Sequence, residues 1–570
     1  MDTLKKWLRQ NKFALFFLTF LVFAVYLNSL GNDFVSDDIP SISNNPNIGK
    51  IDYVLYFKSL RALIIYLTHK VFALDPLFYR LSNIFLHLGS TIVIYSLVAF
   101  FFAPPVPLLT ASIFAVHPLL TESVTWISGA PYSNGAFFAL LSFLSYIHAV
   151  KTGSRKSYSL SLCSFLLGLA CLDKIIVFPA ILTLYELCFG QVKRGWKRLV
   201  PYWGLNIFWL LYLFGLLGKR MAALETTFYQ APGFHNPLLQ VPIAITSYLE
   251  LIFWPKNLTL YHSEMSFTQT EYILRLVGFI FFLATIAWFY KKDKRLFFWL
   301  SFFLISLLPT LTPFGISWIV AERYVYLGSI GIFVFIAWSI NKIGEITSRE
   351  NLAKGKPFGL GSLSPKGWGI GEVEQRTNQI SFIILSILLI VLSFRTILRN
   401  RDWKNQDSLW LATAKTSPSS PQNHNNSGDY YGRHGNLEKA VEEFKRAIEL
   451  NPRYGDAYHN LANTYQQMGK AELAIENYQD ALSFNPNLWQ SYQNLAAIYF
   501  SQQKYELALQ EIQNAIKTNP KNSLLYTNLG VIYLKLGNSQ NAKNSLNQAL
   551  KLDPENQQAK ELLLSPNLAD

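Results

Sequence analysis

Two adjacent carboxylates, Asp37 and Asp38, follow the first long apolar run of the chain. A carboxylate at the end of an apolar segment can act as a general base that takes the proton from a hydroxyl nucleophile. The same acids can instead cap the helix that the segment DDIPSIS predicts, because Asp is a favoured residue at helix N-termini. Successive side chains of an extended loop point to opposite sides, so we expect the two acids to have different roles.

The composition indicates that these acids belong to a membrane protein. Of the 570 residues, 51% are hydrophobic, 15% are aromatic and only 15% are charged, which is too apolar for a soluble protein. Residues 400–570 contain 16 Lys and Arg against 17 Asp and Glu, so the net charge of +14 comes from residues 1–399. This basic excess points to the positive-inside rule of membrane proteins and not to a nucleic-acid partner.

Apolar runs long enough to cross a bilayer, roughly 17 to 25 residues, recur along residues 1–399. We therefore expect an all-α, polytopic membrane bundle with about eleven spans. The expected spans lie near residues 13–30, 80–101, 104–117, 133–150, 157–172, 174–189, 199–218, 273–290, 296–312, 322–340 and 379–398.

Lys and Arg crowd alternate connections between these spans. The basic clusters fall at residues 5–12, 151–156, 193–198 and 291–295. The positive-inside rule places these clusters in the cytoplasm and the intervening loops outside. The expected outer loops are 31–79, 118–132, 219–272 and 313–321. The amino end resembles a signal peptide without a cleavage pattern, so we expect a retained first span, a cytoplasmic N-terminus and, with an odd span count, an extracytoplasmic C-terminal region.

The C-terminal region shows a period of 34 residues, which is the length of a tetratricopeptide repeat. The period is carried by Pro418, Pro452, Pro486, Pro520 and Pro554, by Tyr431, Tyr465, Tyr499 and Tyr533, and by Ala440, Ala474, Ala508 and Ala542. Small residues let the two helices of a repeat approach closely. We expect a membrane domain over 1–399, a connecting helix over 400–418 and an α-solenoid of about four repeats over 419–570.

Several segments together resemble one known family. They are FVSDDIPSISNNPNI, YRLSNIFLHL, HPLLTESVTWISG, FWPKNLTLYH, AERYVYLGSIG and RNRDWKNQDSLW, the last leading into the repeats. The chain resembles the transmembrane and tetratricopeptide-repeat-containing O-mannosyltransferases and their bacterial relatives, within the GT-C glycosyltransferases. It departs from the family where Ala62 follows Arg61 in place of the usual Pro, and where Ala130 replaces a common Arg.

The resemblance implies a polyprenyl-phosphate sugar donor presented at the outer leaflet and transfer with inversion. Such transfer needs a carboxylate base, but it needs no separate acid, because a phosphate monoester leaves well without a proton. By this resemblance Asp37 is the favoured base, and Asp38 orients the site or substitutes as base. No spacing of His, Cys or acidic residues supports a metal site, and no cofactor is expected.

Six other polar residues fall in the expected outer regions and are candidate substrate-binding residues. They are Arg61, His117, Glu122, Lys174, Glu322 and Arg323. Arg323 either faces the donor phosphate while held by Glu322, or forms only an ion pair with it, since guanidinium groups match both phosphate and carboxylate oxygens. Lys174 holds the phosphate or pairs with Asp173. Arg61 is a further phosphate candidate, and the family match makes Glu122, beside His117, a sugar or acceptor contact in place of a helix cap.

Three hypotheses of function follow from these features. The leading one is a membrane glycosyltransferase that moves a hexose, most plausibly mannose, to Ser or Thr hydroxyls of exported proteins, with the repeats engaging the protein acceptor. The second keeps the enzyme class but transfers to a lipid or a surface glycan. The third is a membrane-anchored scaffold, which has no need of many spans or of loop acids. The short repeat array favours a bacterial plasma membrane over an endoplasmic reticulum.

Overall fold

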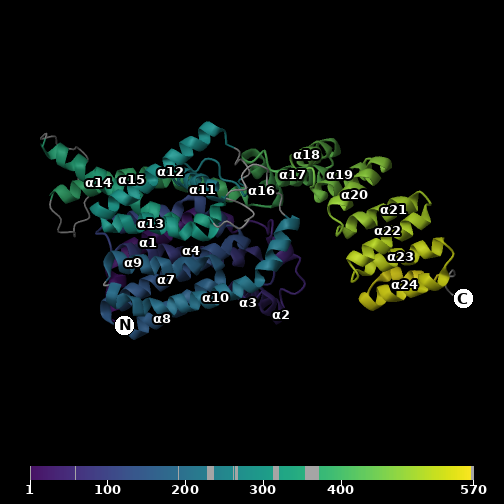
Figure 1. Ribbon diagram of the computed structural model, residues 1–570, viewed down its shortest axis with the longest axis horizontal. Helices are drawn as coiled ribbons and strands as arrows, with labels where there is room; N and C mark the ends of the chain where they lie inside the picture. The colour runs from purple at the N-terminus through teal and green to yellow at the C-terminus, as the bar shows by residue number, and fades with distance from the viewer. Residues whose placement is uncertain are drawn as a thin grey trace. The chain divides into compact units, whose positions relative to one another are not determined.

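Helices make up the two compact units of the chain, Met1–Ala412 and Thr413–Asp570 (Figure 1). The structure is a computed structural model, and it describes residues 2–57, 59–190, 192–227, 237–260, 262, 267–311, 320–353 and 372–565. No strand occurs within these ranges. The predicted all-α fold, with an apolar helical bundle followed by a helical repeat array, is confirmed.

Twelve helices form most of the first unit. They are α1 (Asp2–Tyr26), α4 (Pro76–Val98), α5 (Val106–Val116), α7 (Ala130–Thr152), α8 (Arg155–Cys171), α9 (Phe178–Phe189), α10 (Val192–Thr227), α11 (Pro237–Phe253), α12 (Gln269–Lys292), α13 (Lys294–Leu307), α14 (Ser329–Ala353) and α15 (Glu372–Asp402). Short helices connect them, among them α2 (Ile51–Phe57), α3 (Leu60–Phe72) and α6 (Thr121–Val124), with single turns at η1 (Leu27–Ser29), η2 (Ile39–Ser43), η3 (Pro118–Leu120), η4 (Ile127–Gly129), η5 (Asp173–Val177), η6 (Leu308–Thr310) and η7 (Glu322–Val325).

Local sequence signals set several of these helix ends. Gly153 ends α7 in the left-handed conformation, with φ +69°, which glycine adopts without steric cost. The Ser154 hydroxyl then accepts the first free backbone N–H of α8, from Ser157. Thr268 and Glu271 form a reciprocal capping box at the start of α12. The sharp turn at Gly153 and Ser154 places α7 and α8 side by side.

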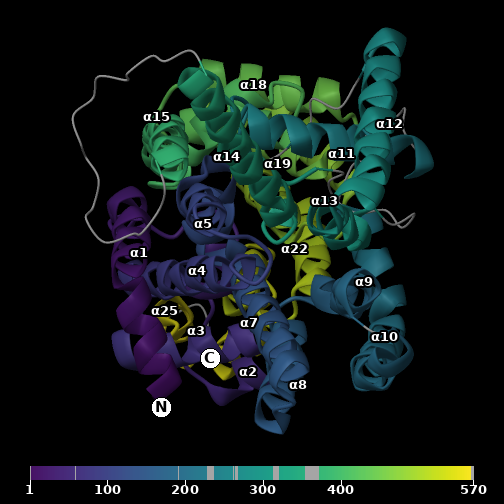
Figure 2. The ribbon, with the colours of Figure 1, turned by 90° about the vertical axis from the view of Figure 1, so that its left-hand side faces the viewer.

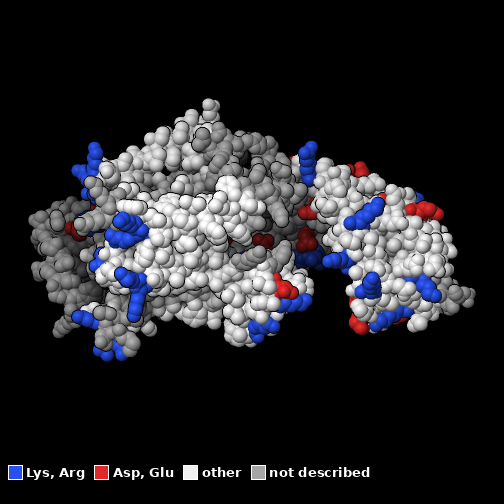
Figure 3. Space-filling model, turned by 60° about the horizontal axis from the view of Figure 1, so that its bottom comes forward, with Lys and Arg blue, Asp and Glu red and all other residues white. Residues whose placement is uncertain are grey.

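Apolar and aromatic packing holds the bundle together. Helix α7 packs against both α4 and α8, and α14 packs against α5, α13 and α15 (Figure 2). Phe143, Tyr185, Phe298 and Trp299 lie in the core of this packing, and Phe298 contacts the other three rings. On the face shown in Figure 3, a broad white band without charged side chains crosses the bundle. Such a surface suits a hydrocarbon environment.

The number of long spans is smaller than expected. Among the described residues, six helices are long and apolar enough to cross a membrane, or seven if α5 and the segment 118–124, bent by 53°, count as one. The expected spans at 174–189 and 296–312 form α9 and α13, which have only 12 and 14 residues. At 1.5 Å per residue such helices do not reach across a hydrocarbon core of about 30 Å.

The region expected as one long outer loop, 219–272, contains a helix that sequence reasoning missed. Helix α11 is apolar over Leu239–Phe253 and packs against α12. Its run of apolar residues is interrupted by Pro242 and by the polar pair Thr246 and Ser247. The loop prediction was therefore wrong over these residues. The expected outer loop at 313–321 lies largely outside the described residues.

The second unit is an array of helix pairs. The pairs are α17 (Pro421–Arg433) with α18 (Leu437–Leu450), α19 (Gly455–Gln467) with α20 (Ala471–Phe484), α21 (Trp489–Ser501) with α22 (Tyr505–Thr518), and α23 (Ser523–Lys535) with α24 (Ser539–Leu552), followed by α25 (Gln557–Leu563). Helix α16 (Gln406–Thr416) precedes them. The alanines at the 34-residue period, such as Ala440 and Ala474, are fully buried between the paired helices. Their small size permits the close packing that the period predicted.

Candidate active site

The two adjacent acids have opposite environments. Asp38 is fully buried, and its carboxylate accepts backbone N–H groups of Ser128 at 2.7 Å and of Val35 at 3.3 Å. Asp37 is exposed, and its carboxylate makes no hydrogen bond or ion pair within the described part of the chain. Burial raises the pKa of Asp38 to about 6, against the opposing effect of the Ser128 hydrogen bond. Asp38 is thus held by the protein, whereas Asp37 is exposed.

A tight turn, and not an extended strand, separates the two carboxylates. Ser36 has a left-handed backbone with φ +52°, which is unfavourable for a residue with a Cβ atom. Its N–H donates to the side-chain oxygen of Gln406 at 2.8 Å. Asp38 begins the turn η2 but makes no side-chain capping hydrogen bond. The expected difference between the acids is present, but its cause is this turn, and the capping alternative does not match the geometry.

Arg80 fixes the backbone that leads to the acids. Its guanidinium is fully buried and donates to the carbonyl oxygens of Asn32 and Asp33 and, at 3.1 Å, to that of Thr125. Three charge-assisted hydrogen bonds from one rigid fork leave the loop little freedom. Sequence reasoning missed this residue, although an Arg within the apolar run of α4 was a signal, because charge inside a span is costly and seldom without a role.

Asn400, at the end of the last span, ties the same loop to the first span. Its amide donates to the carbonyl oxygen of Val25 and to the side chain of Asn28, both at 2.7 Å. The Thr125 hydroxyl donates to its side-chain oxygen at 2.8 Å, and Asn32 donates to its backbone oxygen at 3.0 Å. The ends of α1 and α15 therefore meet at the loop that carries the acids.

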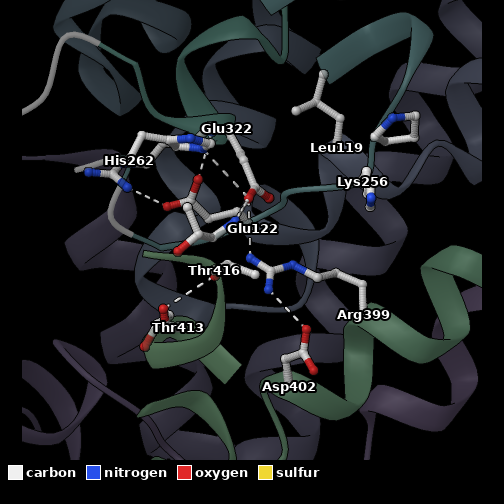
Figure 4. A network of polar contacts seen from close by, with 12 residues as sticks. Leu119, Glu122, Lys256, His262, Glu322, Arg399, Asp402, Thr413 and Thr416 are labelled. Atoms are coloured by element: carbon white, nitrogen blue, oxygen red, sulfur yellow. Dashed lines mark hydrogen bonds and ion pairs between the residues drawn. The ribbon is translucent and has the colours of Figure 1, made fainter. Parts of the chain in front are cut away.

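A second group of charged residues forms crossed ion pairs (Figure 4). Glu122 is fully buried and accepts both the guanidinium and, at 2.8 Å, the backbone N–H of Arg323. Glu322 is fully buried and pairs with Arg399 at 3.2 Å, which also donates to Asp402 at 2.9 Å. The expectation that Glu322 holds its neighbour Arg323 is therefore wrong. Adjacent residues of the tight turn η7 project to different partners.

The loop before α12 reaches the same ion pairs. Thr259 donates its backbone N–H to the Glu322 carboxylate, and the Nε2 atom of His262 lies 3.9 Å from that carboxylate. Burial raises the pKa of Glu322, while the charge of Arg399 lowers it. Burial, with Arg399 and Arg323 nearby, lowers the pKa of His262 to about 3. Burial and the two arginines thus favour the neutral form of His262.

Two cations meet at one aromatic ring. The ammonium of Lys174 lies 3.2 Å from the ring centroid of Tyr324 and 5.2 Å from that of Tyr132. The guanidinium carbon of Arg323 lies 5.2 Å from the Tyr324 centroid and 5.6 Å from the Trp126 ring. The electron-rich face of an aromatic ring attracts a cation placed over it. The Tyr324 ring therefore brings Lys174 close to Arg323, whose own charge is paired with Glu122.

Arg61 lies in the first turn of α3, close enough to Asp38 and Asp37 for their charges to stabilise it. Burial lowers its pKa, and the two acids oppose that effect. Its Nε atom is buried and has no hydrogen-bond partner in the described ranges of the chain. Arg61 therefore interacts electrostatically with both acids.

His117 has both ring nitrogens engaged by the protein. Nδ1 accepts the backbone N–H of Leu119 at 3.3 Å, so Nε2 carries the proton and donates to the carbonyl oxygen of Ile252 at 2.9 Å. The ring also packs 4.9 Å from that of Phe333. Of the sequence candidates, His117 therefore has no ring nitrogen left for a substrate.

The segment HPLLTESVTWISG joins the two groups of polar residues. Its Glu122 holds Arg323, its Thr125 accepts Arg80, and its Ser128 holds Asp38. Trp126 stacks on Trp403 at 5.6 Å and donates to the carbonyl oxygen of Val35. One short stretch thus holds Asp38, Arg80 and Arg323, although these residues come from segments far apart in the chain.

The fold and this site define a class of protein, a polytopic membrane protein with buried charged residues at its helix ends and with tetratricopeptide repeats in the C-terminal part of its sequence. The TPR repeat family matches residues 428–469 and 496–537, and the tetratricopeptide repeat family matches 455–488 and 524–556. The predicted repeats are confirmed.

Relatives of known name resemble most of the chain. The chain is 24% identical over 492 residues to Protein O-mannosyl-transferase TMTC3 of Homo sapiens, covering 76% of this chain and 51% of that one. It is 24% identical to Protein O-mannosyl-transferase F38B6.6 of Caenorhabditis elegans, covering 75% and 61%. The predicted likeness to these transferases is confirmed, and the chain spans about half the length of the first of them.

Solved structures resemble a smaller part. They include MamA, with a TM-score of 0.24, 21% identity and coverage of 26% of this chain and 85% of that one. They also include YrrB, a TPR protein, with a TM-score of 0.24, 19% identity and coverage of 32% and 90%.

Proposed function

We propose that the chain is a membrane glycosyltransferase of GT-C type that transfers mannose from a polyprenyl-phosphate donor to Ser or Thr hydroxyls of exported proteins. The observation that carries the proposal is the pair Asp37 and Asp38. The Asp37 carboxylate is exposed and makes no hydrogen bond or ion pair with the described residues, whereas Asp38 is buried and held by two backbone N–H groups. The names of the relatives, all Protein O-mannosyl-transferases, support the transferred sugar and the acceptor class.

In the proposed reaction Asp37 takes the proton from the acceptor hydroxyl. The acceptor oxygen forms a bond to the anomeric carbon as the bond from that carbon to the phosphate oxygen breaks, and the configuration inverts. The electron pair leaves with the phosphate, which needs no added proton because the second pKa of a phosphate monoester is near 6. The proposed reaction uses Asp37 as a carboxylate base.

Positive charge in the site would stabilise the departing phosphate. Arg61 is beside the acids, while Arg323 and Lys174 share the Tyr324 ring. Guanidinium and ammonium groups fixed before the reaction stabilise charge that develops in the transition state. In this proposal Glu122 and Glu322 position Arg323 and Arg399, and His117 fixes the fold, so these three act through other residues.

We assign the site to the extracytoplasmic side of the membrane, with a cytoplasmic N-terminus, and to a bacterial plasma membrane. The basic ends of the helices near Lys151 and Arg295 contact Phe100, Phe101 and Phe102 at the turn between α4 and α5. The positive-inside rule makes this the cytoplasmic side. A variant with Cys163, Cys171 and Cys188 replaced by Ser is the background for labelling. A cysteine at exposed Asn44 should react with an impermeant reagent in intact cells, and one at Thr152 should react only after the membrane is opened.

The test of the activity uses three variants in a reconstituted assay normalised to folded protein. Asp37→Asn preserves size but removes the base, so transfer should fall about 10²- to 10⁴-fold while donor binding persists. Asp38→Asn should reduce transfer less, because its role is to hold the loop. Parental transfer rates in both single variants and in the double variant would show that neither acid is the base.

The chemical class of the acceptor has an alternative. A lipid or a surface glycan is also a hydroxyl acceptor, but the repeat array is a protein-binding architecture and favours a polypeptide. Mass spectrometry of exported proteins from cells with and without the chain distinguishes the two. Hexose on Ser or Thr that depends on the chain supports the proposal, whereas a hexose-modified lipid as the sole product supports the alternative. If the chain transfers hexose to no acceptor, only the scaffold hypothesis remains.

A further inference from the structure

A cavity opens between α11 and the first turns of α12. It has a volume of about 370 Å³, and its lining includes Glu250, Phe267, Glu271, Arg275 and Gly278. These residues come from two helices that pack against each other and from the segment that precedes α12. The proposed transfer reaction uses none of them, so the cavity is a separate feature of the membrane unit.

One guanidinium is fixed in this cavity. The Nη1 atom of Arg275 donates to the hydroxyls of Thr246 at 3.2 Å and Ser247 at 3.1 Å, and Nη2 donates to the Glu250 carboxylate at 3.0 Å. The guanidinium carbon also lies 4.6 Å from the ring centroid of Phe267. A guanidinium has five N–H donors. The Nε–H and one N–H of Nη2 therefore donate to no residue in the described ranges.

Two carboxylates line the cavity with this guanidinium. Glu250 uses one oxygen for Arg275, and Glu271 uses one oxygen to accept the backbone N–H and the hydroxyl of Thr268 at 2.8 and 2.9 Å. The other oxygen of each carboxylate accepts no hydrogen bond from the described part of the chain. Two acids against one base give the lining a net negative charge. The cavity is therefore unsuited to a ligand that is only an anion.

An apolar face of α12 continues from the cavity. Leu274, Val277 and Phe281 are exposed, and their spacing of three and seven residues places them on one side of the helix. Gly278 lies on the same side, and a Cβ atom there would meet only the Thr246 methyl group within 4 Å, at 3.7 Å. Since α12 is long and apolar enough to cross a membrane, this face has room for an acyl chain.

The charged part of the cavity lies toward one end of this span. Helical side chains point toward the N-terminus, and the Arg275 guanidinium reaches back to Phe267, which precedes the first residue of α12, Gln269. Lys291 and Lys292 end the same helix. A long charged side chain near the end of a span places its head at the membrane interface. The charged groups are therefore at the level of lipid head groups.

We propose that this cavity binds a phospholipid with a primary-amine head group, such as phosphatidylethanolamine. The phosphodiester accepts the two remaining N–H groups of Arg275, and the ammonium donates to the remaining oxygens of Glu250 and Glu271. The acyl chains follow the apolar face of α12. A choline head group has no N–H to donate, and an anionic lipid without an amine brings no cation to the two carboxylates. The inference does not rest on the proposed transfer reaction.

Native mass spectrometry of the full chain in detergent measures binding of phosphatidylethanolamine, phosphatidylcholine and phosphatidylglycerol with identical acyl chains. The parent should prefer phosphatidylethanolamine. Glu250→Gln with Glu271→Gln should weaken its binding about tenfold or more and remove the preference, because charge-assisted hydrogen bonds are lost. Glutamine at 271 still accepts from Thr268, so the cap of α12 is retained. Glu472→Gln with Glu476→Gln, two exposed acids of α20, is the matched control and should bind as the parent does.

A second pair of variants tests the place of binding. Gly278→Leu fills the cavity without removing a charge, so phosphatidylethanolamine binding should fall. Gly204→Leu adds the same side chain at an exposed position of α10 where a Cβ atom meets nothing within 4 Å, and binding should be unchanged. Equal binding of the three lipids, a preference for phosphatidylglycerol or for polyprenyl phosphate, or parental binding by Gly278→Leu would overturn the inference.

The transfer assay separates this inference from the proposed function. If the parent binds phosphatidylethanolamine selectively and the cavity variants do not, the lipid site stands even where no sugar is transferred. If the parent transfers sugar but binds the three lipids equally, the lipid site fails and the activity stands.

Discussion

The guanidinium and the backbone N–H of Arg323 both bind the carboxylate of Glu122, which lies 201 residues earlier in the chain. Glu322, the immediate neighbour of Arg323, turns away and pairs with Arg399. The two acids are fully buried, and the side chain of Arg323 is only 16% exposed. Each acid thus neutralises a cation from another segment, which ties the turn η7 to α6 on one side and to the end of α15 on the other.

Removal of one partner of the first pair should destabilise the protein strongly. Glu122→Gln leaves the buried Arg323 without its counter-charge, and we expect a loss of about 3 to 5 kcal/mol in the free energy of unfolding. Thermal denaturation in detergent measures this loss. The exposed substitution Glu442→Gln is the control and should have little effect.

The corresponding double variant separates stability from activity. Glu122→Leu with Arg323→Met replaces the pair by apolar groups, and such exchanges are often neutral or stabilising. Stability should recover, while transfer should remain low because the site has lost a cation. A double variant that recovers both would mean that Arg323 acts only through the fold.

Asp38 should give the stability of the protein a dependence on pH. Burial raises its pKa from the ordinary value of 3.8 to about 6 in the folded protein. The folded state therefore binds the proton more tightly, so this stabilisation is complete below pH 3.8 and is lost as the pH rises through about 6. Relative to Asp38→Asn, the parent should lose stability between about pH 4 and pH 7. If the free energies of unfolding of the parent and of Asp38→Asn depend on pH in the same way, the pKa of Asp38 is not raised. Asp37→Asn is the control.

Arg80→Lys should reduce transfer more than donor binding. A lysine has one compact ammonium in place of the planar fork, so it cannot reach the carbonyl oxygens of Asn32, Asp33 and Thr125 together. A displacement of about 1 Å at the acids can cost about 10²-fold in rate. Single-turnover kinetics with separate donor titration checks this, with the exposed Arg155→Lys as the matched control. A loss of donor affinity with an unchanged rate would assign Arg80 to binding.

Gln503→Gly should stabilise the repeat array. The turns inside the four repeats fall at Gly435, Gly469, Gln503 and Gly537, and all four have positive φ, with +61° at Gln503. A residue with a Cβ atom is destabilised by about 1 to 2 kcal/mol in this conformation. Gln503→Gly removes the Cβ atom, and it should raise the free energy of unfolding by about 1 kcal/mol once the greater conformational entropy of glycine in the unfolded chain is subtracted. Denaturation monitored by circular dichroism tests it. Gly469→Ala should lower stability at the equivalent position.

The sequence by itself determined the features that depend on local pattern. The 34-residue period predicted the helix pairs, because Ala440 and its counterparts are small wherever two helices must touch. Apolar runs predicted where the membrane helices lie, since burial and lipid exposure both require them. The motif around Asp37 and Asp38 singled out the acids, although an alternation argument gave the wrong reason for their difference.

Only the tertiary structure decided which residues act together. Arg323 pairs with Glu122 and not with its sequence neighbour Glu322, because the turn η7 directs adjacent side chains to different helices. No local sequence pattern predicts this pairing. Arg80 and Asn400 bring the loop of the acids to the ends of three helices by hydrogen bonds between segments up to 375 residues apart. Hydrophobic periodicity is a property of neighbouring residues, whereas the partners of buried polar and charged groups depend on how distant helices pack. For this reason the sequence alone did not reveal the roles of Arg80 and Asn400.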